Sequence, residues 1–243
     1  MAHEQAAVTL AGRLRGAARV AALSGAGMSV ESGLPTFRSS SGALWRNHDP
    51  MTLATPQAFA RDPVLVWEWY RERLRAHRTA TPNAGHIALV DIAGRVPSFV
   101  MVTQNVDGLH TEAGSRDVIE LHGNLRRARC VRCGQNVPTP LDGELPPRCT
   151  CGGLLRPDVV WFGENLPPGA FERAHTAAAE ADVFIVAGTS AIVYPAAGLV
   201  DIAKRAGAFV VEVNPEETSA TALCDLSVRA PSGAFLRLVV ECL

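Results

Sequence analysis

The segment that decides the fold reads Arg19-Val20-Ala21-Ala22-Leu23-Ser24-Gly25-Ala26-Gly27-Met28-Ser29. Its apolar start predicts a short buried strand, and the glycine-rich sequence that follows predicts a tight turn. Glycines in such a turn let the backbone approach a pyrophosphate, whose charge the N-terminus of a following helix would favour. Taken alone, G-x-G is also an ordinary turn, and Val30 stands where the dinucleotide-binding fingerprint has a third glycine. Both interpretations stay open at this point.

Three further apolar runs, 98–103, 183–187 and 208–213, have the same character as the first strand. Near-continuous apolar strands are typical of a parallel sheet that is covered on both faces. Helical patterns lie between these runs, at residues 83–93, 168–181 and 195–206. This alternation predicts an α/β fold with a doubly wound, mostly parallel, Rossmann-like sheet.

Two segments interrupt the alternation, residues 34–78 and residues 126–156. The first is rich in aromatic residues and predicts helices after Pro56 and Pro63. The second contains a cluster of cysteines. We expect the two segments to form a small lobe, made of a helical insertion and a zinc-binding module. Residues 1–33, 79–125 and 157–243 would then form the larger, Rossmann-like domain.

The cysteine cluster has the spacing of a metal site: C-x-x-C followed, fifteen residues later, by C-x-C. In a chain with cytosolic character this pattern favours zinc over disulfides. Its residues are Cys130, Cys133, Cys149 and Cys151. Four thiolates leave no coordination position for a catalytic water, so this zinc is expected to be structural. Two other cysteines, Cys224 and Cys242, are expected to be small buried hydrophobic residues.

Charge and hydropathy exclude several classes of protein. The net charge of -1 over 243 residues argues against a generally basic nucleic-acid wrapper or a polybasic membrane binder. Arginines gather beside the cysteines, which suggests either a zinc ribbon that binds nucleic acid or, as we expect, a solvated face. Residues 183–200 carry no charge, but internal glycine, serine and proline divide them into strand, loop and helix. We therefore expect a soluble cytoplasmic protein without a targeting or membrane segment.

Polar blocks recur along the chain in a characteristic order. The blocks are residues 24–29, 31–38, 103–110, 120–123, 156–164, 188–190 and 213–215, with the cysteines between the fourth and the fifth. This ordered series, over roughly residues 22–233, resembles the sirtuins, which are NAD-dependent protein-lysine deacylases. The resemblance implies that NAD lies in a cleft between the edge of the sheet and the small lobe.

His122 is the candidate general base. It follows a short apolar run, residues 118–121, and precedes Gly123, so it can project from the edge of the sheet, and an imidazole can act as a base near neutral pH. The resemblance implies that His122 takes a proton from a ribose hydroxyl while the acyl group passes from lysine to ADP-ribose and nicotinamide leaves. His110 has a helical context and is expected to be structural.

The resemblance also assigns contacts with the cofactor. Asn105 and Asp107 would hold the nicotinamide carboxamide and the ribose, although Asp107 could also be a simple helix cap. Gln104 would meet the ribose hydroxyls, Phe37 would shield the reactive carbon, and Arg38 would reach the phosphates. The residues expected around the diphosphate are Gly25, Ala26, Gly27 and Ser29, and those on the adenosine side are Gly188, Thr189, Ser190, Asn214 and Ser232.

Substrate contacts are expected from two places. The main chain of Val160, Trp161, Phe162 and Gly163 would pair with an extended peptide. Tyr70 and Arg73 lie three residues apart in a helical pattern and share a face, where a solvated arginine is one interpretation. The other comes from a resemblance to the sirtuin subgroup that removes succinyl and malonyl groups, in which a Tyr and an Arg at this spacing line the acyl pocket and Ala54 would widen it. A guanidinium can bind an acyl carboxylate bidentately.

Two alternatives to a deacylase remain open from the sequence. A protein mono-ADP-ribosyltransferase would use the same cofactor and the same bond cleavage, and product analysis separates it from a deacylase. A zinc-ribbon DNA-associated regulator would keep its activity without His122, whereas the enzyme would not.

Overall fold

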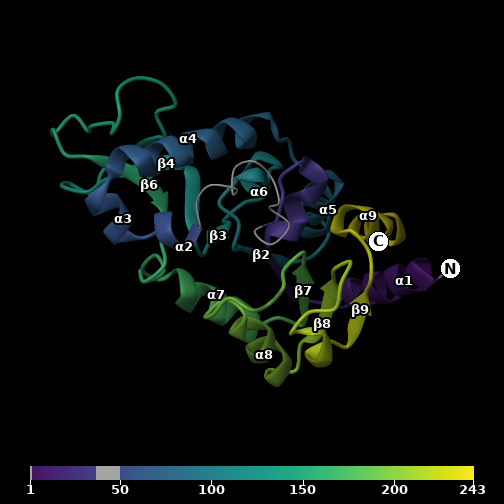
Figure 1. Ribbon diagram of the computed structural model, residues 1–243. Helices are drawn as coiled ribbons and strands as arrows, with labels where there is room; N and C mark the ends of the chain where they lie inside the picture. The colour runs from purple at the N-terminus through teal and green to yellow at the C-terminus, as the bar shows by residue number, and fades with distance from the viewer. Residues whose placement is uncertain (1, 37–49) are drawn as a thin grey trace.

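The computed structural model describes residues 2–36 and 50–243, which form a large domain and a small lobe (Figure 1). The large domain contains a six-stranded sheet with the order β3-β2-β1-β7-β8-β9, in which each neighbouring pair of strands is parallel. The strands are β1 (Arg19–Ser24), β2 (Ser98–Thr103), β3 (Ile119–Glu120), β7 (Val183–Ala187), β8 (Phe209–Val213) and β9 (Leu226–Val228). The predicted parallel α/β sheet is confirmed.

Helices cover both faces of this sheet. On one face α1 (Ala2–Arg15), α5 (Ala84–Ala93) and α9 (Ser232–Cys242) pack together around buried Leu10, Leu89 and Leu236. On the other face α7 (Ala170–Ala179) and α8 (Gly198–Arg205) pack over buried Phe184 and Leu199. The sheet is therefore doubly wound, as the alternation of apolar strands and helices predicts.

The small lobe joins the two segments that interrupt the alternation. It contains α2 (Pro50–Leu53), α3 (Pro56–Arg61), α4 (Pro63–Thr79) and an antiparallel sheet of β5 (Asn136–Pro138), β4 (Gly123–Cys130) and β6 (Leu155–Val159). Helices α3 and α4 begin at the prolines named above, because the side chains of Thr55 and Asp62 cap them by accepting main-chain N–H groups. Trp67, which is fully buried, donates from Nε1 to the main-chain oxygen of Leu155 at 2.8 Å and so ties helix to sheet.

The helix expected after the glycine-rich turn has a different form. Residues Ala26–Ser32 form a short 3-10 helix, η1, which ends at Gly33 with φ of 84°. The physical reason lies in the neighbouring loop: the Gly27 N–H donates to the main-chain oxygen of Gly188 at 2.7 Å, while Met28 N–H bonds back to Gly25 at 3.0 Å. Two further short helices, α6 (Leu109–Glu112) and η2 (Thr221–Leu223), complete the list of helices in the described residues.

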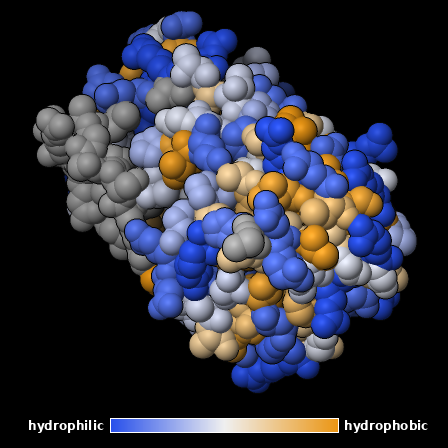
Figure 2. Space-filling model, turned by 90° about the vertical axis from the view of Figure 1, so that its right-hand side faces the viewer, coloured by the Kyte–Doolittle hydropathy of each residue, from blue (hydrophilic) through white to orange (hydrophobic). Residues whose placement is uncertain are grey.

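The uncharged stretch 183–200 is divided as predicted, because β7 and the start of α8 lie at its two ends with a loop between them. Within residues 2–36 and 50–243, none of the helices has both the length and the hydrophobicity needed to cross a membrane. Figure 2 shows a face on which hydrophobic side chains are scattered among hydrophilic ones.

Candidate functional site at the edge of the parallel sheet

The site begins where β1 and β7 lie side by side, since the loops that follow these two strands meet there. Gly25 N–H donates to the Ala187 oxygen at 3.1 Å, and the Gly188 N–H donates to the Val213 oxygen at 3.0 Å. A Cβ added at Gly25 would lie 2.7 Å from Thr189 Cβ, and one at Gly27 would lie 2.8 Å from the Gly188 oxygen. The glycines are therefore required by the contact between the two loops, and the expected contact of this turn with a diphosphate remains a prediction.

Asn105 and Asp107 follow β2 and lie against the glycine-rich loop. The Asn105 side-chain amide donates from Nδ2 to the Gly25 oxygen at 3.0 Å and to Ser29 Oγ at 3.1 Å. Ser29 Oγ donates to Asp107 Oδ2 at 2.7 Å, and Asp107 Oδ1 accepts the main-chain N–H of Leu109 at 2.8 Å. Asp107 thus binds the first N–H of α6, whose N-cap residue is Gly108, but it is buried and also contacts the predicted cofactor loop, unlike a simple helix cap.

Residues expected on the adenosine side also meet at this edge. Gln104 Nε2 donates to Thr189 Oγ1 at 2.9 Å, and Asn214 N–H donates to the Val228 oxygen at 3.1 Å. The Ser190 oxygen accepts from Ser219 Oγ at 3.4 Å. Ser232 lies at the start of α9, where it is buried and its Oγ has no hydrogen-bond partner among the described residues. A buried hydroxyl without a partner fits a bound polar ligand.

His122 lies between β3 and β4, in the turn that joins the large domain to the small lobe. Its Nδ1 lies 3.0 Å from the Gln104 main-chain oxygen. A carbonyl oxygen can only accept, so in the neutral ring Nδ1 carries the proton and Nε2 is the basic nitrogen. Burial lowers the pKa of His122 from its ordinary value, and the hydrogen bond with Gln104 opposes this shift. The ring is therefore neutral at pH 7, as a general base must be.

Phe37 and Arg38 lie outside the described residues, so their predicted contacts with the cofactor remain predictions.

The residues predicted to line the acyl pocket come together in the small lobe. Tyr70 is buried, and its hydroxyl accepts a hydrogen bond from Trp161 Nε1 at 2.8 Å. The Arg73 guanidinium carbon lies 4.7 Å from the centre of the Trp69 ring and 5.9 Å from that of Tyr70. Ala54 is buried, and its main-chain oxygen accepts the Phe162 N–H at 2.9 Å. Helix α4 and the loop after β6 thus share one wall. Arg73 is half-buried and packs against aromatic rings there.

The predicted peptide-binding segment, residues 160–163, is not a strand, because β6 ends at Val159. The N–H groups of Val160, Trp161 and Phe162 donate to His122, Glu164 and Ala54, respectively. Pairing with an extended peptide would therefore use carbonyl groups of this segment and the N–H of Gly163. The bond from Val160 to the His122 oxygen, 2.9 Å long, ties this segment directly to the candidate base.

Arg156 and Glu164 form an ion pair in which Arg156 is buried and Glu164 is half-buried. Arg156 Nη1 and Nη2 lie 2.5 and 2.8 Å from the two Glu164 carboxylate oxygens. The Arg156 guanidinium carbon stacks 3.4 Å from the centre of the Trp161 ring. The sequence shows the spacing of Arg156, Trp161 and Glu164, but only the fold shows that the ion pair between Arg156 and Glu164 holds the loop that carries Trp161.

The predicted zinc ligands converge. The Sγ atoms of Cys130, Cys133, Cys149 and Cys151 all lie within 4.8 Å of one another. Four thiolates at such distances fit one tetrahedral zinc ion, and the cluster lies in the small lobe at the ends of β4 and of the loop before β6. The other two cysteines were expected to be buried but are half-buried: Cys224 follows the end of η2, and Cys242 is the last residue of α9.

The arginines beside the cysteines are paired with acids. Arg127 lies 2.7 Å from Glu120 and 3.1 Å from Asp158, and Arg126 pairs with Glu112. These pairs cancel much of the local positive charge and favour the expected solvated face over a nucleic-acid interface.

Comparison with known proteins agrees with this site. A model described as "Sir2 family" matches residues 25–195. The chain is 56% identical to an NAD-dependent protein deacylase of Thermus thermophilus over 222 residues, which cover 89% of this chain and 87% of the relative. It is 52% identical to an NAD-dependent protein deacylase of Aquifex aeolicus, with 91% of this chain and 94% of the relative covered.

Solved structures give the same result. A Sir2 homologue in complex with NAD superimposes with a TM-score of 0.88 and 45% identity, over 96% of this chain and 92% of that one. A Sir2 complex with a p53 peptide and NAD+ has a TM-score of 0.83 and 34% identity, over 96% of both chains. The fold and the site define the class of NAD-binding proteins that combine a doubly wound sheet with a small, cysteine-rich lobe. The chain belongs to the Sir2 family, which confirms the resemblance drawn from its polar blocks.

Proposed function

We propose that this Sir2-family chain is an NAD-dependent protein-lysine deacylase that prefers acyl groups ending in a carboxylate, such as succinyl and malonyl, and retains some deacetylase activity. The observation that carries the preference is the position of Arg73, which packs against Tyr70 in a buried wall shared with Trp161. The relatives named above are NAD-dependent protein deacylases, which supports the general activity.

The proposed roles at the cofactor edge follow from the hydrogen bonds there. NAD supplies an ADP-ribose group that accepts the acyl group when nicotinamide leaves. The Gly25–Gly27 main chain cradles the diphosphate, and Asn105 presents its amide oxygen to the nicotinamide carboxamide because its amide nitrogen already binds Gly25 and Ser29. His122 takes up a ribose hydroxyl proton at Nε2, since Nδ1 is held by the Gln104 oxygen.

The proposed acyl specificity rests on charge. Burial lowers the pKa of the Arg73 guanidinium, and the neighbouring Tyr70 partly opposes this shift. A guanidinium nevertheless stays protonated at neutral pH, so a carboxylate can bind it bidentately. The Tyr70 hydroxyl accepts from Trp161 and so can point its own proton towards the same carboxylate. An acetyl group offers neither contact.

The remaining proposals concern the setting of the reaction. An acyl-lysine peptide would lie extended along residues 160–163, so that few side chains of the substrate are read and selectivity for sequence is loose. The zinc module, residues 126–156, stabilises the lobe and takes no part in the chemistry. Together with the helical insertion, residues 34–78, it forms one small lobe on the NAD-binding domain. A cysteine cluster that fits a zinc ion better than disulfides is in keeping with a cytoplasmic protein.

The test is mass analysis of the products formed from NAD and matched peptides that carry succinyl-, malonyl- or acetyl-lysine. We expect unmodified lysine, nicotinamide and acyl-ADP-ribose, with a higher kcat/KM for the acidic acyl groups. ADP-ribose attached to protein or peptide, without loss of the acyl group, would support the alternative mono-ADP-ribosyltransferase. A preference for acetyl-lysine would overturn the proposed specificity and leave the deacylase itself intact.

A further inference from the structure

Behind the cofactor edge, a second row of buried polar side chains links α5 to the ends of β1 and β2. The rings of His86 in α5 and His110 in α6 lie 4.7 Å apart with an angle of 57° between them, and both residues are buried. His110 Nε2 lies 2.8 Å from Ser24 Oγ, which in turn lies 2.8 Å from Thr103 Oγ1. The proposed function uses none of these four side chains.

The protonation of His86 follows from the cap of its own helix. The Asn83 main-chain N–H donates to His86 Nδ1 at 3.3 Å, so Nδ1 must carry a lone pair. In the neutral ring the proton is therefore on Nε2. This Nε2 is buried and has no hydrogen-bond partner among residues 2–36 and 50–243, which makes it a donor without an acceptor.

The neutral ring of His110 can carry its proton on Nδ1 or on Nε2, and the neighbouring His86 distinguishes these two tautomers. A proton on Nδ1 would place a second buried donor without an acceptor beside that of His86, since His110 Nδ1 also has no partner among the described residues. A proton on Nε2 instead donates to Ser24 Oγ, the Ser24 hydroxyl donates to Thr103 Oγ1, and Nδ1 then carries a lone pair, so that no second N–H without an acceptor lies beside that of His86. Burial, together with the nearby His86, lowers the pKa of His110 to about 3, so the ring is neutral.

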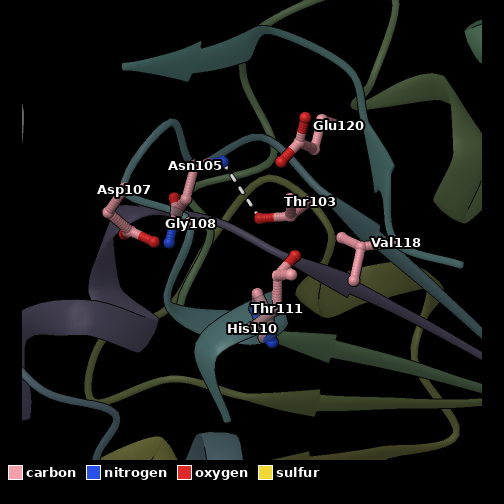
Figure 3. Close-up of a pocket in the computed structure, with 8 residues that line it drawn as sticks. All are labelled: Thr103, Asn105, Asp107, Gly108, His110, Thr111, Val118 and Glu120. Atoms are coloured by element: carbon pink, nitrogen blue, oxygen red, sulfur yellow. Dashed lines mark hydrogen bonds between the residues drawn. The ribbon is translucent and has the colours of Figure 1, made fainter. Parts of the chain in front are cut away.

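We propose that His110, held as the Nε2–H tautomer beside His86, is a positioning residue for Asn105. Its bond to Ser24 fixes the hydroxyl that holds Thr103, and Thr103 Oγ1 in turn accepts the Asn105 main-chain N–H at 3.0 Å. Figure 3 shows this last bond, with His110 on α6 below it and with Thr103 and Asn105 on the strand-end loop. The inference deepens the proposed function, because it rests on Asn105 holding the nicotinamide end of NAD.

The first test compares two variants that differ in one donor. His110→Phe keeps the volume of a ring but cannot donate to Ser24, whereas the His110→Gln amide can. We expect His110→Phe to raise KM and the calorimetric Kd for NAD about tenfold, with kcat changed less than about threefold, and His110→Gln to stay within about threefold of the parent, since one hydrogen bond is lost or kept. His175→Phe, on the exposed side of α7, is the matched control.

Equal losses in His110→Phe and His110→Gln would show that His110 only packs, and an unchanged Kd in a folded His110→Phe would show that it positions nothing. Either result overturns the proposal.

The second test uses the unsubstituted protein, so it does not depend on whether a His110 variant folds. A long-range 15N–1H NMR spectrum of the whole labelled protein identifies which ring nitrogen carries the proton. We expect Nε2–H for both His86 and His110 at pH 7, and a proton on His110 Nδ1 overturns the proposal. If Asn105→Ala kept the parental affinity for NAD and nicotinamide, the assigned role of Asn105 would be overturned. The tautomers measured in the parent protein would not be affected by that result, so the two failures are distinguishable.

Discussion

The cofactor edge and the proposed acyl pocket are linked through His122, which bonds to Gln104 on one side and to Val160 on the other, but they are built in different ways. The loops of the edge are joined by main-chain groups at strand ends, on which its side chains are placed: Gln104 N–H donates to the Ser24 oxygen at 3.0 Å, and Gly27 N–H to the Gly188 oxygen at 2.7 Å. The pocket is assembled from side chains, with Trp161 bonded to Tyr70 and Arg73 stacked on Trp69. The geometry of a site built from main-chain groups is set by the register of the parallel sheet. A site built from side chains can bind a different ligand after a single substitution. Substrate choice can therefore vary while the chemistry stays constant.

The largest expected effect comes from removing the zinc on which the pocket's lobe depends. Cys130 and Cys149 lie in the same buried cluster as Tyr70 and Trp161. We expect Cys133→Ser, or removal of the metal by a chelator, to abolish deacylation, because the lobe loses its packing. Metal content, activity and near-UV circular dichroism measure this effect. A soluble, active protein without zinc would show that the lobe holds itself together.

His122→Ala removes the group that joins the two regions. We expect turnover to fall by roughly 10²-fold or more, the usual scale for a general base, while the Kd for NAD changes little because the main-chain cradle is intact. Steady-state kinetics on a saturating acyl-peptide and calorimetry with NAD measure the two quantities. His175→Ala, an exposed histidine on α7, is the control. Near-parental turnover in His122→Ala would exclude the assigned role.

Arg73→Met tests the pocket alone. Loss of a hydrogen bond to a charged group costs about 1.5–3 kcal/mol, so kcat/KM for succinyl-lysine should fall on the order of 10- to 100-fold. Deacetylation should be spared, because an acetyl group makes no contact with the guanidinium. Arg75→Met, an exposed change on the same helix, should affect neither activity. Equal losses on both substrates would mean that Arg73 supports the fold.

The pH profile tests the cofactor edge without a mutation. Burial holds the pKa of His122 below its ordinary 6.5, so the ring stays neutral at pH 6.5 and is protonated only as the pH falls further. The acid limb of kcat/KM should therefore have its midpoint below pH 6.5. A midpoint above pH 6.5 would require a different group or a more exposed ring.

The smallest expected effect is on the helix that carries the pocket. Asp62 accepts the Leu65 N–H at 2.9 Å and caps α4 about two turns before Tyr70. Asp62→Ala should lower the free energy of unfolding by about 1 kcal/mol, the usual value of such a cap. KM for succinyl-peptides should change less than about twofold. A large rise in KM would mean that the start of α4 sets the position of the pocket.

Much of the fold could be predicted, because its signals are local. The apolar runs at 98–103 and 183–187 match β2 and β7, and Pro56 and Pro63 mark the starts of α3 and α4. The cysteine spacing predicted a cluster whose Sγ atoms do meet. The form of η1 could not be predicted, because it depends on a bond from Gly27 to Gly188, which is distant in the sequence.

The sequence by itself determined the parallel sheet, the cysteine cluster and the family, since strand hydrophobicity and short ligand spacings are local properties and the order of the polar blocks can be read along the chain. Only the tertiary structure decided how those blocks work together. The placing of Tyr70 against Trp161, the support of Trp161 by Arg156 and Glu164, and the contact of His110 with Ser24 all depend on segments far apart in the chain. Hydrogen-bond direction and burial arise only once these segments are packed, and no local pattern encodes them.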